Sequence, residues 1–159
     1  MSRTTLRRAC GAILAVSALG VAATAQADQP VKPHGKEIRL SEASATLQPT
    51  FVDTGAPGPS AGDLAVLHDG LLREDGSSAG SFNQVCTLAE LKGNPFVSGF
   101  ECSGSLTLGG DTITMQGPFV PALDEQSAAI TGGTGRFRTA RGEIVFRAEA
   151  DEIVVVLAG

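Results

Sequence analysis

Short strand patterns separated by turn residues run through most of this chain, and no segment has a sustained helical period. In residues 96–108, for example, Phe100, Cys102, Leu106 and Leu108 occupy alternate positions, which lie on one face of a strand, and polar residues separate most of them. We expect eight strands, over residues 37–53, 63–73, 81–91, 96–108, 112–119, 126–131, 139–150 and 153–157, the first of them bent or ended near Pro49. So many short strands with regular turn signals are typical of an all-β barrel or sandwich.

The stretch Ile130–Gly142, which reads ITGGTGRFRTARG, contains three glycines in four positions. Glycines this dense indicate backbone with positive φ or with very close neighbours. Apolar Ile130, Phe137 and Ala140 are interleaved with them, so we expect a structured turn rather than a linker. A dinucleotide fingerprint would need glycine in place of Arg138 and a helix after it, and the sequence offers neither. The stretch therefore predicts a turn before the C-terminal strands and argues against a nucleotide site.

Residues Thr131–Gly142 resemble the hallmark of the dirigent and allene oxide cyclase barrel superfamily, especially its bacterial members. Further matching residues lie upstream in the same order: Gly62, Asp63, Asp69, Gly76, Gly80, Cys86, Thr87, Leu88, Cys102, Leu108, Gly110, Ile113, Thr114, Gln116 and Gly117. The match covers roughly Glu37 to Leu157. The resemblance implies an eight-stranded antiparallel barrel, a lipocalin-like cup that can hold one small ligand. It also implies a homotrimer formed through the barrel walls.

The N-terminus has the pattern of a secretion signal. Basic residues precede an apolar run over 9–23, and Ala25-Gln26-Ala27 follows as a cleavage site. We therefore expect residues 1–27 to be a signal peptide and the mature chain to be secreted or extracytoplasmic. Prolines and a glycine in 28–36 predict a flexible leader. The barrel domain is expected over 37–159.

The charge balance of the mature chain limits its partners. Residues 1–27 hold three of the 12 basic and none of the 17 acidic residues, which leaves nine basic residues and a net charge of −8. Such a chain repels nucleic acid and anionic membranes. The apolar run at the N-terminus is also too short for a good membrane span. We expect no nucleic-acid partner and no membrane-spanning segment.

Two cysteines remain after the predicted cleavage, Cys86 and Cys102. An even pair in an exported chain indicates a disulfide. A metal site is the alternative, but neither a CxxC pair nor a nearby histidine accompanies them. We therefore predict a Cys86–Cys102 disulfide, which would close a loop of about 15 residues and stabilise the fold by roughly 3 kcal/mol.

Motifs for covalent or metal chemistry are weak in this sequence. Residues 76–80 match the G-x-S-x-G pattern of serine hydrolases, but a strand follows them and no histidine lies after His68. His34 and His68 are the two histidines, and no acidic run has calcium-loop spacing. We therefore expect a polar hairpin turn at 76–80, and neither a metal nor a cofactor.

Three ionisable residues are candidates for a catalytic role. The resemblance places Arg141, in the Ala-Arg-Gly of the hallmark, near the cavity. Asp69 is the acid of the second expected strand, and Glu101 is a candidate because related cyclases use carboxylates inside the barrel. An arginine and a carboxylate together could polarise a substrate carbonyl or epoxide. The alternative is that each points outward as a solvated charge, with Arg141 bonding the carbonyls of the glycine turn.

The sequence thus predicts a secreted barrel that binds a small hydrophobic molecule and guides its cyclisation or isomerisation without a cofactor. Tyrosine and tryptophan are absent, so phenylalanines must supply the cavity wall: Phe82, Phe96, Phe100, Phe119 and Phe146 among them. The lack of tyrosine argues against plant-type lignan coupling and against cyclisation of a jasmonate-pathway allene oxide. The alternative function is a non-catalytic ligand-binding or structural barrel of the cell envelope.

Overall fold

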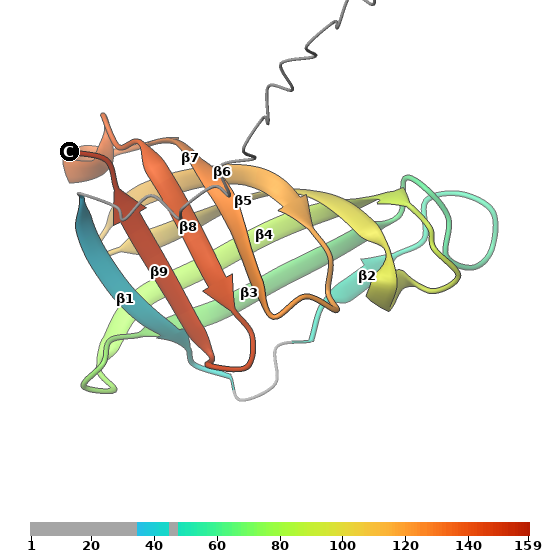
Figure 1. The fold of residues 1–159 in the computed structure, drawn as a ribbon, viewed down its shortest axis with the longest axis horizontal. Coiled ribbons are helices and arrows are strands. Elements are labelled where there is room, and N and C mark those ends of the chain that lie inside the picture. Colours follow the sequence, from blue (N-terminus) through green and yellow to red (C-terminus); the bar gives the residue numbers. More distant parts are fainter. Residues whose placement is uncertain (1–34, 45–47) are drawn as a thin grey trace, which may run out of the picture. The chain divides into compact units, whose positions relative to one another are not determined.

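The computed structural model describes residues 35–44 and 48–159, and strands dominate them (Figure 1). The strands are β1 (Lys36–Glu42), β2 (Thr50–Val52), β3 (Leu64–Leu72), β4 (Ser78–Glu90), β5 (Gly99–Leu108), β6 (Asp111–Phe119), β7 (Glu125–Gly133), β8 (Gly142–Arg147) and β9 (Glu152–Leu157). Two short 3-10 helices, η1 (Pro95–Val97) and η2 (Gly135–Phe137), interrupt them. The expected signal peptide and residues 28–34 of the expected leader lie outside the described residues.

All neighbouring strands pair antiparallel, in the order β1-β9-β8-β7-β6-β5-β4-β3-β2. A further pairing of Ser41 and Glu42 in β1 with Leu72 and Leu71 in β3 closes the sheet on itself. Strands β1 and β3–β9 therefore form a closed eight-stranded antiparallel barrel, which confirms the predicted fold class. Strand β2 is an addition that pairs with the opposite end of β3, away from β1 (Figure 1).

The expectation of one strand over 37–53, bent or ended near Pro49, was wrong, because the described residues of this segment form two strands, β1 and β2. The ladder with β3 ends one residue after β1, where the Ala43 amide donates to the Gly70 carbonyl. The backbone amide and hydroxyl of Ser44 then donate to the Asp69 carboxylate, at 3.0 and 2.8 Å. Since Ser44 bonds a side chain instead of the β3 backbone, it does not continue the pairing with β3. The next described residue that pairs with β3 is Thr50.

The glycine stretch is a turn at one end of the barrel, as predicted, although β7 extends through Gly133. Gly135 has φ of 53°, and a Cβ built on it would lie 1.8 Å from the Asp111 carboxylate. The Phe137 ring packs beneath the turn and is 5% exposed. The Arg136 guanidinium donates to the Leu108 carbonyl at 2.9 Å. Tight packing thus explains this stretch without a ligand.

Two buried clusters fill the described part of the barrel. The larger cluster includes Leu71, Leu106, Ile113, Ile144 and Val155, which point inward from both walls. A smaller one surrounds Cys86 and Cys102, which pair directly across β4 and β5 and form a disulfide. The predicted disulfide is thereby confirmed.

Candidate functional site

A cavity of about 860 Å³ opens at the end of the barrel where β2, η1 and the β8–β9 turn lie. Its wall is rich in aromatic side chains, because it includes six of the seven phenylalanines: Phe51, Phe82, Phe96, Phe100, Phe119 and Phe146. The five expected to line a cavity are all among them. The volume lies within the range of pockets that enclose a small organic molecule.

Two of these rings form the floor of the cavity. Phe82 and Phe146 contact each other with ring centroids 5.9 Å apart and planes inclined at 51°. Phe82 is 1% exposed and belongs both to the cavity lining and to the larger buried cluster. The barrel is therefore hollow at one end and solidly packed beyond these rings.

Gln84 is a buried polar residue in the cavity wall. It lies on β4 between Phe82 and Cys86 and shares their inward parity. The residue is 7% exposed, and its side-chain amide has no hydrogen-bond partner among the described residues. No fully enclosed side-chain polar atom in the described chain lacks a partner, so the amide remains open to the cavity. It can therefore donate to, or accept from, a bound molecule.

Glu42, at the end of β1, also lines the cavity. It shares the parity of buried Leu40, which directs its side chain inward. Burial, followed by the nearby carboxylates of Asp151 and Asp69, raises the pKa of Glu42 to about 7. A carboxyl with this pKa can both take and return a proton near neutral pH. Glu42 was not among the site residues predicted from the sequence, although its alternation with Ile38 and Leu40 was a usable signal.

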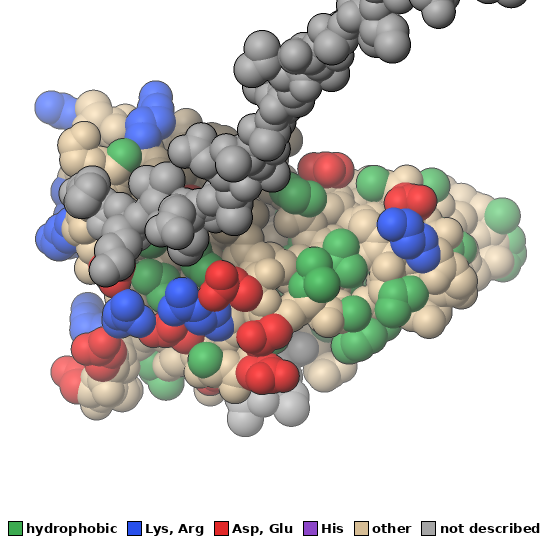
Figure 2. All heavy atoms as spheres, in the orientation of Figure 1, with side chains coloured by type: hydrophobic (Ala, Val, Ile, Leu, Met, Phe, Trp, Pro, Cys, Tyr) green, Lys and Arg blue, Asp and Glu red, His purple; other side chains and the backbone are tan. Residues whose placement is uncertain are grey.

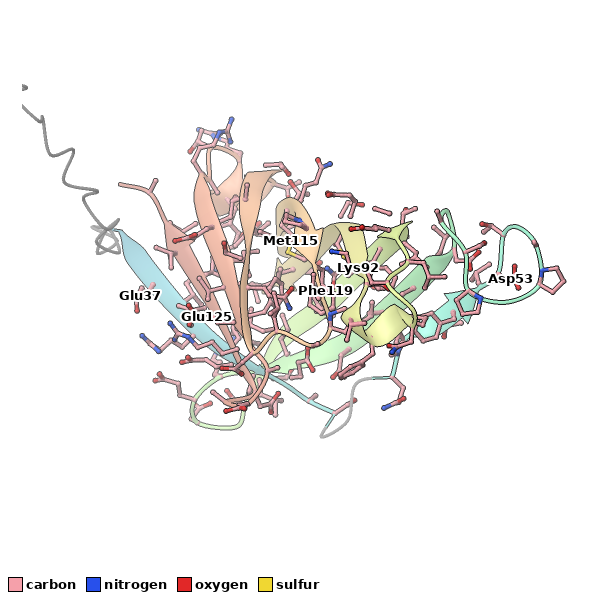
Figure 3. The ribbon with its side chains drawn as sticks, turned by 45° about the vertical axis from the view of Figure 1, so that its right-hand side comes forward. Glu37, Asp53, Lys92, Met115, Phe119 and Glu125 are labelled. Atoms are coloured by element: carbon pink, nitrogen blue, oxygen red, sulfur yellow. A yellow bond between two sulfur atoms is a disulfide. The ribbon has the colours of Figure 1, made fainter. Side chains whose placement is uncertain are left out.

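A ladder of ion pairs crosses the outer wall beside the cavity mouth. Arg147 pairs with Glu125 and Glu152, each at 2.8 Å, and Arg39 pairs with Glu152 at 2.5 Å and Glu37 at 2.8 Å. Figure 2 shows charged side chains gathered over β1, β8 and β9, and Figure 3 labels the two ends of the ladder, Glu37 and Glu125. Because the carboxylates of Glu125 and Glu152 both pair with Arg147, its positive charge is neutralised by the protein itself.

A family model described as an allene oxide cyclase barrel like domain matches residues 42–156. The chain belongs to this family. The match confirms the resemblance predicted from the glycine stretch. A comparison with curated protein sequences found no match.

Three solved structures share this fold. A structure described as pyocyanin demethylase is 24% identical, with a TM-score of 0.65, over 77% of this chain and all of the other. An exo-specific intermolecular Diels–Alderase, AbnU, is 16% identical with a TM-score of 0.56, over 79% of this chain and all of the other. The pterocarpan synthase dirigent protein GePTS1 is 15% identical with a TM-score of 0.52, over 75% and 78%. At these identities the likeness establishes the fold alone.

Asp69, one of the three predicted site residues, points inward but is covered. It is 7% exposed and accepts hydrogen bonds from the Ser44 amide, the Ser44 hydroxyl and the Gly70 amide. Burial would raise the pKa of Asp69, but these hydrogen bonds outweigh it and the pKa is lowered. Asp69 is not part of the cavity lining, although it acts on Glu42 through its charge.

Glu101 and Arg141 lie away from the cavity. Glu101 is exposed on β5 between two inward residues, Phe100 and Cys102, so it faces outward. Arg141 precedes β8 at the end opposite Arg147, and its guanidinium donates to the Ala140 carbonyl at 2.6 Å. The structure therefore does not bring the three predicted residues together, and their catalytic roles stay predictions.

Other features of the barrel offer no comparable site. A second hollow of about 480 Å³ lies between β1 and the β3–β4 turn and is lined largely by charged residues, including Arg73 and Arg136. No group of three or more potential metal ligands occurs in the part of the chain that the structure describes. Within that same part, no helix is long and apolar enough to cross a membrane.

Proposed function

We propose that this barrel binds a small, largely hydrophobic molecule in the phenylalanine-walled cavity and promotes its cyclisation or isomerisation. The observation that carries the proposal is the combination in one 860 Å³ cavity of six aromatic side chains with the inward polar groups of Glu42 and Gln84. Apolar pockets with a few convergent polar groups are the usual form of small-molecule sites.

The chemistry follows from these two polar groups. The Glu42 carboxylate accepts a proton from one atom of the substrate, and the carboxylic acid so formed returns it to another atom of the same molecule. Substrate and product then have the same composition, and Glu42 is regenerated. The Gln84 amide orients the substrate, while the aromatic wall holds it in a reactive conformer. Asp69 acts as a positioning residue that fixes Ser44 and the end of β1.

Export and assembly complete the proposal. A disulfide is compatible with an extracytoplasmic location, where such bonds persist. Assembly into a homotrimer through the barrel walls would leave the cavity mouth free. Sedimentation equilibrium of the mature protein should then give three times the mass of one chain, whereas a monomer at micromolar concentration would contradict the trimer.

A screen for thermal stabilisation by small hydrophobic molecules tests the binding step. Ligand at about 100 times its Kd should stabilise the folded state by ~2.7 kcal/mol. That corresponds to a rise in Tm of several degrees for a domain of this size. If no class of hydrophobic ligand raises Tm, the proposed function is wrong.

Once a turnover is found, Glu42→Gln separates catalysis from binding alone. A general acid–base residue contributes roughly 10²–10⁴-fold to rate, so the variant should lose turnover by such a factor while keeping its affinity for uncharged ligands within a few-fold. Glu143→Gln, at an exposed position of β8 outside the cavity lining, is the matched control and should keep full turnover. Unchanged turnover in Glu42→Gln would favour a cavity that only binds and confines its ligand.

A further inference from the structure

Acidic side chains outnumber basic ones in the cavity lining. Four carboxylate residues line it: Glu42, Asp124, Asp151 and Glu152. Arg147 is the one basic residue of the described lining, and Glu125 and Glu152 already hold its guanidinium. The cavity therefore carries net negative charge with no free cation in its described wall.

Among these four carboxylates, Glu42 is the one whose surroundings would favour a bound positive charge most strongly. It makes no ion pair or hydrogen bond through its side chain to any described residue, and the charges that raise its pKa are those of two other acids, Asp151 and Asp69. Side-chain carboxylates removed from water are normally paired or hydrogen-bonded. The unpaired carboxylate therefore leaves a position in the cavity where a positive charge would be stabilised.

Two further observations point to a ligand at the same place. Gln84 is more than nine-tenths buried, unpartnered among the described residues, and directed into the cavity. Its carbonyl oxygen can accept a hydrogen bond from an ammonium group. Six phenylalanine rings surround the space, and the face of an aromatic ring attracts a cation within about 6 Å.

We propose that the ligand of this cavity is a hydrophobic, ring-containing molecule that carries a positive charge, such as a protonated amine, with its nitrogen beside Glu42. The inference rests on the proposed function, since it specifies what the same cavity binds. A carboxylate ligand of the same size would face the four acids and is disfavoured by like-charge repulsion. A neutral ligand would gain the apolar contacts without the charge interaction.

Three probes of matched size test the charge preference: 1-naphthylmethylamine, 1-naphthylmethanol and 1-naphthoic acid. Calorimetric titration of the purified mature protein at pH 8 and low salt keeps Glu42 ionised and limits screening. The amine should bind about tenfold tighter than the alcohol, and the acid should bind most weakly. Equal or tighter binding of the alcohol or the acid would overturn the charge preference and leave the proposed function standing.

Variants locate the effect. Glu42→Gln should weaken the amine about tenfold and leave the alcohol unchanged, whereas Glu143→Gln, exposed on β8 and outside the cavity lining, should change neither. Asp151→Asn supplies a second variant and should weaken the amine by a smaller factor. Equal loss of amine and alcohol in Glu42→Gln would overturn the role of its charge. If none of the three probes binds and none displaces a fluorescent apolar dye, the proposed function itself fails, and this inference with it.

Discussion

Phe82 of β4 and Phe146 of β8 come from opposite walls of the barrel, and their rings meet with centroids 5.9 Å apart. This contact divides the interior into an open cavity on one side and a packed core on the other. The depth of the cup is therefore set by two side chains, and a ligand bound in the cavity would rest on them. Replacing either ring should change both stability and the shape of the site.

Phe82→Ala should lower the free energy of unfolding by about 3–5 kcal/mol, because it removes a buried ring and leaves a void between cavity and core. Urea denaturation monitored by circular dichroism would measure the loss. The matched control is Phe96→Ala at the cavity mouth, where the side chain is 66% exposed and the expected change is within about 0.5 kcal/mol. Equal losses in both variants would contradict the assignment of Phe82 as the floor.

Glu42→Gln should make the protein more stable above pH 7. The folded-state pKa of Glu42 is raised from 4.5 to about 7, so ionising it costs stability progressively as the pH rises through that window. Below pH 4.5 the carboxyl is protonated in both states and the variant should match the parent. With allowance for solvent screening, the gain above pH 7 should be about 1–2 kcal/mol. A variant with unchanged pH dependence between pH 4.5 and 7 would show that Glu42 is not buried among acids.

Asp69→Asn should destabilise the protein at neutral pH by about 1–3 kcal/mol, because the carboxylate accepts three hydrogen bonds in a buried position. Its folded-state pKa is lowered, so its contribution is present above the ordinary pKa of an aspartate and is lost as the pH falls through the folded value. Denaturation curves across this range would measure the effect. Ser44→Ala removes one of the three bonds and should cost less. A larger cost for Ser44→Ala would contradict the proposed role of Asp69 at the end of β1.

Loss of the Cys86–Cys102 disulfide should cost about 3 kcal/mol in the chain-entropy model, because the bond joins residues separated by 16 positions. The double Cys→Ser variant, compared with the parent in urea, measures the cost. Thiol titration of the denatured, unreduced mature protein should find no free thiol. Two free thiols in protein isolated from its native compartment would contradict both the bond and the proposed export.

The strand pattern predicted an all-β barrel or sandwich, and the family resemblance of the glycine stretch chose the barrel. The disulfide and the aromatic wall were predicted from the cysteine count and the composition. The alternation of apolar and polar residues located β3 and β5. Cys86 and Cys102 are the two cysteines left in the expected mature chain, so an exported protein would pair them with each other, as the structure does. Alternation separates the two faces of a strand but does not say which one is inward. For that reason Glu101 was a candidate although it faces solvent, and Glu42 was missed although it faces the cavity.

The position of Arg141 depended on information that no local pattern contains. Strand β8 runs from Gly142 to Arg147, so its first and last residues lie at opposite ends of the barrel. Only the complete strand order shows that the cavity opens at the Arg147 end. The division of the first expected strand could not be predicted from local sequence either. It depends on hydrogen bonds between Ser44 and Asp69, which lie 25 positions apart in the chain.

Binding in the phenylalanine-walled cavity is the central claim, and the chain contains its own control. Six phenylalanines line the cavity, whereas Phe137 packs under the glycine turn, outside the cavity lining. Carbon-13 labelling of the phenylalanine rings allows all seven to be followed by NMR while 1-naphthylmethylamine and 1-naphthylmethanol are added. We expect shifts of the six cavity rings and an unchanged Phe137 signal. Unchanged cavity rings, or a shift at Phe137 alone, would contradict the claim.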